Sequence, residues 1–215
     1  TGIGKALDSL KDRPDARVGV VGMGAGTVSC YAKSGQTFRF YDINPDVVRI
    51  AEKWFLYLED AKKRGAKVEI VVSDARLALD REPSQQFDVL LLDAFSGDSV
   101  PVHLLTQEAF TIYDRHMKPD GIIAVHITNS YLVLAPVIEK IAAAVGFKTV
   151  RIATEADGDH DSTDYILVTR NETFLKATPE QLLGNEIELK QDVRLWTDRY
   201  HNLLRILDIP QNIKE

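Results

Sequence analysis

The fold of this chain is decided by VGVVGMGAGT, residues 18–27, where an apolar run leads directly into three closely spaced glycines. The first four residues predict a buried strand, and Gly22, Gly24 and Gly26 predict a tight turn that opens a helix. Glycines at these positions let the backbone turn sharply and approach a ligand closely. A G-x-G-x-G pattern alone also fits a turn that binds nothing, so the rest of the chain must decide between the two.

Outward from this turn, strand-like and helix-like segments alternate along the chain. Further strands are predicted over residues 37–41, 68–72, 87–92, 121–127, 148–152 and 165–169. Helices are predicted over residues 3–10, 44–58, 104–116, 134–145 and 196–207. This alternation predicts an α/β fold with a mostly parallel seven-stranded sheet that helices cover on both faces.

Three aspartates, Asp42, Asp74 and Asp93, stand at or just beyond the end of a predicted strand. Ligands of parallel sheets bind at the carboxyl ends of the strands, near the point where strand order reverses. Asp42 lies 20 residues after Gly22, which suits a carboxylate that accepts both ribose hydroxyls of a nucleoside. Asp74 and Ala75 would lie beside the base, which favours adenosine. Each aspartate also fits a helix cap or a loop acid, and the spacing does not separate a nicotinamide cofactor from an adenosyl sulfonium.

The composition of the chain excludes some classes of partner. Its 215 residues suit one α/β domain with a short appendage. A formal net charge of -6 argues against sequence-independent binding of nucleic acid and suits a small cationic ligand better. The single cysteine, Cys30, excludes an intramolecular disulfide and is compatible with a reducing compartment. We expect a cytoplasmic location, either as a free protein or as the cytosolic domain of a membrane protein.

The chain resembles spermidine synthases, the polyamine aminopropyltransferases, and their relatives in the class I S-adenosylmethionine-dependent methyltransferase superfamily. The resemblance covers about residues 2–169. It is carried by VGVVGMGAGT (18–27), FYDINPDVV (40–48), VVSDARLAL (71–79), FDVLLLDAFSGDSVPVHLLT (87–106) and MKPDGIIAVHITN (117–129). It implies a class I methyltransferase-like Rossmann fold, with an adenosyl-binding domain over residues 1–170 and an extension over 171–215 that packs on the same domain.

The resemblance also implies roles for the residues of the site. In the family, the acid matching Asp42 holds the ribose, the acid matching Asp74 meets the adenine amino group, and the acid matching Asp93 is the catalytic carboxylate. The other cofactor-binding residues that we expect are Gly22, Gly24, Gly26, Ile43 and Ala75. The expected cofactor is S-adenosylmethionine, its decarboxylated form or methylthioadenosine, and no metal is expected.

A carboxylate at Asp93 suits aminopropyl transfer, in which an amine attacks a carbon beside a sulfonium. Because the amine arrives protonated, one acid can bind the ammonium, orient it in line and accept its proton. Asp98, five residues later, is either a second amine anchor or a loop acid. His126 and Asn129 could line the pocket. For His126 the alternative is a buried, hydrogen-bonded histidine. The segment 196–202 either folds over the site or packs as an amphipathic helix.

Two departures from the family leave the substrate open. Spermidine synthases carry an acid inside the glycine motif for the amino group of the decarboxylated cofactor, and here that position is Ala25. Their aspartate-serine-serine-aspartate-proline loop is replaced by DAFSGD, residues 93–98. Three interpretations follow: aminopropyl transfer to an amine, methyl transfer to an unknown acceptor, or a non-catalytic adenosyl-binding module of a membrane protein. The expected partner is a small-molecule amine or methyl acceptor and not nucleic acid; a homodimer and attachment to membrane segments outside this chain stay open.

Overall fold

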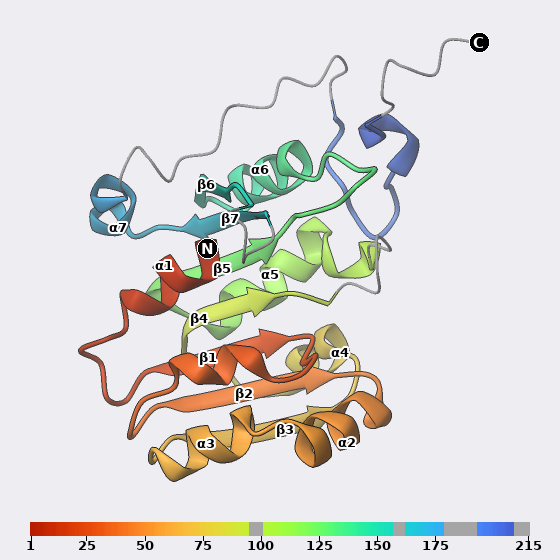
Figure 1. The fold of residues 1–215 in the computed structure, drawn as a ribbon. Coiled ribbons are helices and arrows are strands. Elements are labelled where there is room, and N and C mark those ends of the chain that lie inside the picture. Colours follow the sequence, from red (N-terminus) through yellow and green to blue (C-terminus); the bar gives the residue numbers. More distant parts are fainter. Residues whose placement is uncertain (95–100, 157–161, 179–192, 209–215) are drawn as a thin grey trace.

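The computed structural model of the protein describes residues 1–94, 101–156, 162–178 and 193–208. Within these ranges, seven strands and their flanking helices form three layers, with the sheet between two layers of helices (Figure 1). The predicted α/β fold class is confirmed.

The sheet is mostly parallel, as predicted. Its strands are β1 (Arg17–Val21), β2 (Thr37–Asp42), β3 (Lys67–Val72), β4 (Phe87–Leu92), β5 (Met117–His126), β6 (Lys148–Thr154) and β7 (Thr163–Thr169). Their order across the sheet is β3-β2-β1-β4-β5-β7-β6. Strand order therefore reverses between β1 and β4, where a ligand site is expected. β7 runs antiparallel to both of its neighbours, β5 and β6, while the other pairs are parallel.

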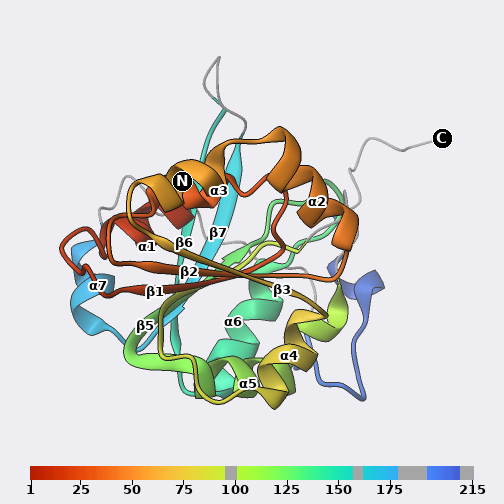
Figure 2. The ribbon, with the colours of Figure 1, turned by 90° about the horizontal axis from the view of Figure 1, so that it is seen from below.

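Helices cover both faces of the sheet. The α-helices are α1 (Gly2–Asp8), α2 (Pro45–Trp54), α3 (Tyr57–Lys63), α4 (Ala75–Arg81), α5 (Gln107–His116), α6 (Ala135–Ala144) and α7 (Glu172–Ala177). Short 3-10 helices are η1 (Thr27–Tyr31), η2 (Val102–Leu104) and η4 (Leu203–Ile206). Figure 2 shows α1, α2 and α3 on one face of the sheet and α4, α5 and α6 on the other.

The central strand β4 is buried along its whole length, because both of its faces are covered. Leu90 and Leu92 belong to the core on the side of α4, α5 and α6. Val89 and Leu91 belong to the core on the side of α1, α2 and α3. An unbroken apolar run is typical of such a two-sided strand. Asp93 is the first residue after this run, so its carboxylate lies where the core meets the carboxyl edge.

The sequence predicted that the glycine turn opens a helix. The structure has the short 3-10 helix η1 at this place. The Arg64 guanidinium donates to the backbone carbonyls of Ser29 at 2.9 Å and Ala32 at 3.2 Å. A continuing α-helix would use such carbonyls for its next turn. The Ser29 carbonyl also accepts the backbone N–H of Ala32 at 3.0 Å, and the chain leaves the helix at Ala32, which has an extended backbone. Arg64 thus stabilises the end of η1.

The structure also differs from the single helix predicted over residues 44–58, because two helices, α2 and α3, stand in its place. Phe55, between them, has an extended backbone with φ of -123° and ends α2. The break allows the buried Leu58 to pack on the glycine turn, where a Cβ on Gly26 would lie 2.9 Å from Leu58 Cδ2. Gly26 is therefore a packing residue between the turn and α3.

The prediction of an amphipathic helix over residues 196–207 is wrong. Thr197 pairs with Tyr200 in an isolated bridge, and the short η4 follows. The backbone N–H of Asp198 donates to Glu108 Oε2 at 3.0 Å, which fastens this segment to α5. Trp196 is nevertheless buried in the core beside α5 and α6. The predicted boundary at residue 170 stays a prediction.

Among the helices of the described residues, none combines the length and the apolar character that crossing a bilayer requires.

Candidate functional site

A cavity of about 410 Å³ opens at the carboxyl ends of β1, β2, β3 and β4, where strand order reverses. The predicted site residues that line it are Gly22, Gly24, Asp42, Ile43, Asp74, Ala75 and Asp93. Two predicted site residues are not in this group: Gly26 packs on α3, and Asp98 lies outside the described residues. One cavity therefore receives residues that are widely separated in the sequence.

The glycine turn forms one wall of this cavity. A Cβ on Gly22 would lie 2.3 Å from the carbonyl oxygen of Asp93, so only glycine lets the end of β1 approach the end of β4. A Cβ on Gly24, in contrast, would meet no atom within 4 Å. The two glycines thus do different things: Gly22 closes the sheet edge, and Gly24 leaves open space against the backbone.

Asp42 ties the end of β2 to the glycine turn. Its Oδ2 accepts the backbone N–H of Met23 at 2.9 Å, and its Oδ1 accepts the backbone N–H of Asn44 at 2.9 Å. A carboxylate has about four lone-pair positions, so each oxygen keeps capacity for a further donor. Asp42 is therefore fixed by the backbone and still able to accept two hydroxyls of a ligand.

Asp74 caps α4 and holds a histidine that sequence reasoning missed. Its Oδ1 accepts the backbone N–H of Leu77 at 2.9 Å, and its Oδ2 lies 2.9 Å from His103 Nε2. Burial alone would raise the pKa of Asp74, but the hydrogen bonds from Leu77 and His103 outweigh it and lower that pKa. The only sequence signal for His103 was its place in the same loop as Asp93, ahead of the α5 cap Thr106.

Asp93 pairs with His126, a residue for which the sequence left two roles open. Asp93 Oδ1 lies 2.7 Å from His126 Nδ1, and the two side chains are 39% and 24% exposed. The sequence left His126 between a pocket-lining and a buried role, and the structure places it beside the catalytic candidate. Asn129, in contrast, caps the following loop: its Oδ1 accepts the backbone N–H groups of Tyr131 and Leu132.

The C-terminal segment reaches the rim of the cavity through one ion pair. Arg76, on α4, binds the carboxylate of Asp198 through both guanidinium nitrogens at 2.7 and 2.5 Å. Arg76 also donates to the carbonyl of His103 at 2.8 Å, and Thr106 donates to Asp198 at 2.9 Å. The loop that carries His103 is therefore fastened to residues nearly a hundred positions later.

The charge of the cavity is one-sided. Three carboxylates, those of Asp42, Asp74 and Asp93, line it, and no lysine or arginine does so among the described residues. Uncompensated carboxylates in a concave site attract cations, including sulfonium and ammonium groups.

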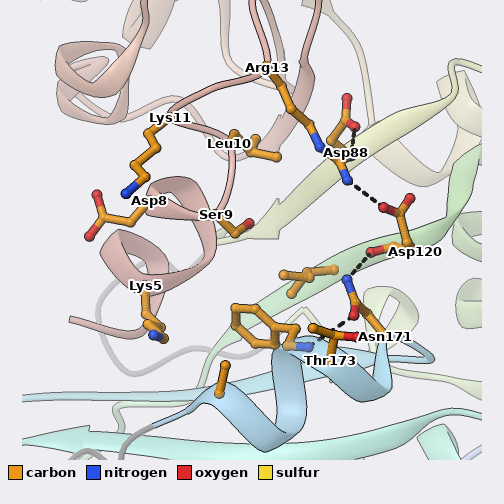
Figure 3. A pocket seen from close by; sticks show the side chains of 13 residues that line it. Lys5, Asp8, Ser9, Leu10, Lys11, Arg13, Asp88, Asp120, Asn171 and Thr173 are labelled. Atoms are coloured by element: carbon orange, nitrogen blue, oxygen red, sulfur yellow. Dashed lines mark hydrogen bonds and ion pairs between the residues drawn. The ribbon is translucent and has the colours of Figure 1, made fainter.

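A second, larger cavity of about 560 Å³ lies at the amino ends of the strands, between α1, β4 and α7 (Figure 3). None of the predicted site residues lines it. Its central charges are paired: Arg13 lies 2.8 Å from Asp88 and 2.5 Å from Asp120, and Lys118 lies 2.8 Å from Asp88. Volume alone would favour this cavity, but the charges of Asp88 and Asp120 are already paired within the protein.

Sequence comparisons find relatives among both aminopropyltransferases and methyltransferases. No profile of a known protein family matches the chain. A polyamine aminopropyltransferase of Vibrio vulnificus is 29% identical over 114 residues, which are 50% of this chain and 36% of the relative. An N-terminal histidine N-methyltransferase of Emericella nidulans is 25% identical over 179 residues, which are 77% of this chain and 31% of the relative. The chain thus spans about a third of the length of these curated relatives.

Solved structures share the fold. A probable spermidine synthase from Corynebacterium glutamicum has a TM-score of 0.60 at 20% identity, covering 78% of this chain and 60% of that one. Human methyltransferase-like protein 13 in complex with SAH has a TM-score of 0.55 at 18% identity, covering 83% and 82%. A spermidine synthase in complex with the transition state analogue AdoDATO has a TM-score of 0.56 at 14% identity, covering 97% and 68%. The resemblance to spermidine synthases and the class I methyltransferase-like fold are confirmed.

Proposed function

We propose that this domain binds an adenosyl sulfonium and transfers a group from it to a small acceptor, with aminopropyl transfer to an amine as the first candidate. The observation that carries the proposal is the shared cavity: Asp42, Asp74 and Asp93 line it together, with Gly22 and Gly24, at the reversal point of the sheet. The named relatives of the chain, an aminopropyltransferase and a methyltransferase, support a transferase of this kind.

The residues that line the cavity support the binding of a nucleoside. Asp42 would accept the ribose hydroxyls, because its oxygens are oriented by backbone donors and keep lone pairs. Gly24 would let the ligand lie against the backbone, since the space that a side chain would fill is empty. Asp74 would accept the adenine amino group on an oxygen that it shares with His103, with Ile43 and Ala75 as apolar neighbours.

Asp93 is the proposed base. A sulfonium, when bound, supplies a carbon that is open to attack by an amine. Asp93 would hold the incoming ammonium in line and take one proton from its nitrogen. The freed lone pair forms the carbon–nitrogen bond while the carbon–sulfur bond breaks and its electron pair stays on sulfur.

Methyl transfer is the second candidate, and Ala25 favours it. In the resembled family an acid stands at this position, and a second carboxylate there would repel the carboxylate of S-adenosylmethionine. Ala25 removes that repulsion. The third interpretation, a binding module without activity, keeps the same adenosyl site and predicts no transfer.

Calorimetric titration with S-adenosylmethionine, its decarboxylated form and methylthioadenosine tests the proposal. We expect all three to bind, and S-adenosylmethionine to bind at least as tightly as the decarboxylated form. A clear preference for the decarboxylated form would restore a conventional aminopropyltransferase. Failure of all three ligands to bind would overturn the adenosyl site.

A matched pair of variants sharpens this titration. Ala25→Glu should weaken S-adenosylmethionine relative to its decarboxylated form, because it adds a like charge, whereas Ala25→Gln adds the same bulk without charge. Ala25 does not have the left-handed backbone of its glycine neighbours, so neither side chain strains the backbone there. Assays with a panel of diamines, polyamines and methyl acceptors then separate the two transfer reactions, and binding without any transfer would favour the module.

A further inference from the structure

His126 occupies a fixed position between two strands and the catalytic candidate. It is the last residue of β5, and it pairs across the antiparallel ladder with Tyr165 of β7. The two rings stack with centroids 4.7 Å apart and an angle of 17° between their planes. Burial, and then the nearby Asp93 carboxylate, raise the pKa of Tyr165, so its phenol stays neutral. The imidazole is therefore held flat against a rigid, uncharged surface.

Both nitrogens of His126 have partners in the structure. Nδ1 lies 2.7 Å from Asp93 Oδ1, and Nε2 lies 2.8 Å from Thr128 Oγ1. The same hydroxyl oxygen of Thr128 accepts the backbone N–H of Asp164 at 2.8 Å. Because an ionised carboxylate can only accept, Asp93 takes the hydrogen bond from Nδ1–H, and Nε2 of a neutral imidazole is then left to accept the hydroxyl proton of Thr128. The neutral imidazole then carries its proton on Nδ1 and donates it to Asp93.

We propose that His126 is the positioning residue of Asp93, that Thr128 holds His126 in the tautomer that this task requires, and that Tyr165 fixes the plane of its ring. The proposal rests on the proposed function, because it assigns Asp93 as the base. It goes beyond that function by adding a defined series of donors, Thr128 to His126 to Asp93, that runs along the carboxyl edge of the sheet.

In this series the two carboxylate oxygens of Asp93 have different roles. The Nδ1–H of His126 occupies Oδ1 and fixes the plane of the carboxylate, which leaves Oδ2 as the atom that takes the proton of the acceptor ammonium. His126 gains and loses no proton in the step. The hydrogen bond therefore acts through orientation, in the way that an outer partner orients the group that performs the chemistry.

The first experiment tests the pairing without any acceptor. Histidine ring nitrogens are observed by ¹⁵N–¹H correlation NMR, which distinguishes the two neutral tautomers from each other and from the imidazolium. We expect the His126 signals, assigned with His126→Asn, to show the Nδ1–H tautomer in the wild type and the Nε2–H tautomer in Asp93→Leu. Asp42→Ala serves as a control that should leave the signals unchanged. An Nε2–H tautomer in the wild type would overturn the proposal.

The second experiment measures turnover with a reactive acceptor and affinity for methylthioadenosine. His126→Phe keeps a ring that can stack on Tyr165 but removes the donor, so turnover should fall by about 10- to 100-fold with unchanged KM and nucleoside affinity. His126→Asn keeps an N–H donor near the position of Nδ1 and should recover most of the rate. Equal rates in wild type and His126→Phe, or equal losses in both variants, would overturn the positioning role. If no acceptor reacts with the wild type, the proposed function fails, and the NMR result still decides the pairing.

Discussion

Carboxylates are held in different ways at the amino ends of the strands, here called the amino edge of the sheet, and at their carboxyl ends, the carboxyl edge. At the amino edge, the side chain of Asp88 is 0% exposed and lies 2.8 Å from both Arg13 and Lys118. At the carboxyl edge, Asp42 is held by two backbone N–H groups and Asp93 by His126. The amino-edge acid is neutralised by cations, whereas the carboxyl-edge acids are oriented by donors and meet no cation of the cavity lining in the described residues.

This difference shows why the larger cavity is not the better site. In the cavity of about 560 Å³ at the amino edge, the charges of Asp88 and Asp120 are already balanced by cations of the protein. The cavity of about 410 Å³ at the carboxyl edge keeps its negative charge available for a ligand. Substitution of acids at the amino edge should therefore change stability, and substitution at the carboxyl edge should change binding or turnover.

The largest effect is expected at Asp93. Asp93→Asn keeps the shape of the side chain and an oxygen for His126 but loses negative charge and proton acceptance. Turnover with a reactive acceptor should fall by about 100-fold or more, the usual scale for a general base, while methylthioadenosine affinity should change little. The same substitution at the amino edge, Asp120→Asn, is the matched control and should leave turnover unchanged. Normal turnover of Asp93→Asn would make Asp93 a structural loop residue.

The second-largest effect is expected at Asp88, where a substitution should change stability and leave ligand binding unchanged. Asp88→Ala removes the partner of Arg13 and Lys118 and the acceptor of the Arg17 backbone N–H. Urea unfolding should show a loss of about 3 kcal/mol, at the lower end of the range for breaking a buried pair, because both cations are partly exposed and can be solvated. Binding of methylthioadenosine to the folded variant should not change. A weakened nucleoside affinity would contradict the independence of the two edges.

Asp42→Ala should produce a smaller effect, on binding. The loss of methylthioadenosine affinity should be about 1–3 kcal/mol, the cost of leaving buried polar partners unpaired. Asp46→Ala is the control, because Asp46 is an exposed acid of α2 outside the cavity lining. Calorimetry that finds equal affinities for wild type and Asp42→Ala would remove Asp42 from the ribose site.

The smallest effect is a pH dependence of stability at the amino edge. His116 is fully buried, its Nδ1 lies 3.2 Å from the Gln85 backbone nitrogen, and its Nε2 lies 2.7 Å from the Leu79 carbonyl oxygen. Burial lowers the pKa of His116 below its ordinary value. The unfolded chain therefore binds a proton that the folded chain does not, so stability is complete above about pH 6.5 and decreases as the pH falls below it.

Urea unfolding between about pH 7.5 and 5.5 measures this effect. The loss cannot exceed about 1.4 kcal/mol per pH unit for one proton. His116→Gln cannot titrate and should show a shallower slope, even if its stability is lower at every pH. Equal slopes in the two proteins would assign the pH dependence to other groups.

The sheet could be predicted from the sequence because its signals are local and strong. The apolar run of β4 and the glycine turn after β1 were sufficient to place both strands within a residue of their observed ends. The failures occurred where segments contact residues that are distant in the sequence. Arg64 binds carbonyls at the end of η1 more than thirty positions earlier, and the segment around Asp198 is fastened to Arg76 and Glu108.

The candidate site shows the same limit. Strand ends placed Asp42, Asp74 and Asp93 in one region, and the structure brings all three to one cavity. The partners of these acids could not be predicted, since the contacts of Asp74 with His103 and of Asp93 with His126 join residues 29 and 33 positions apart. The packing of Gly26 on Leu58 could not be predicted either, and its role in cofactor binding stays a prediction.

The position of β7 between β5 and β6 has a consequence for the order in which the strands can join the sheet during synthesis. During synthesis β6 emerges before β7, yet in the sheet β6 pairs only with β7 among the described strands. β6 therefore has no place in the sheet until the ribosome has released the later strand, and the two must join together as a hairpin. Tyr165, which supports His126, arrives with that hairpin. The nascent chain can form the nucleoside half of the cavity early, but the support of Asp93 is completed among the last steps of folding.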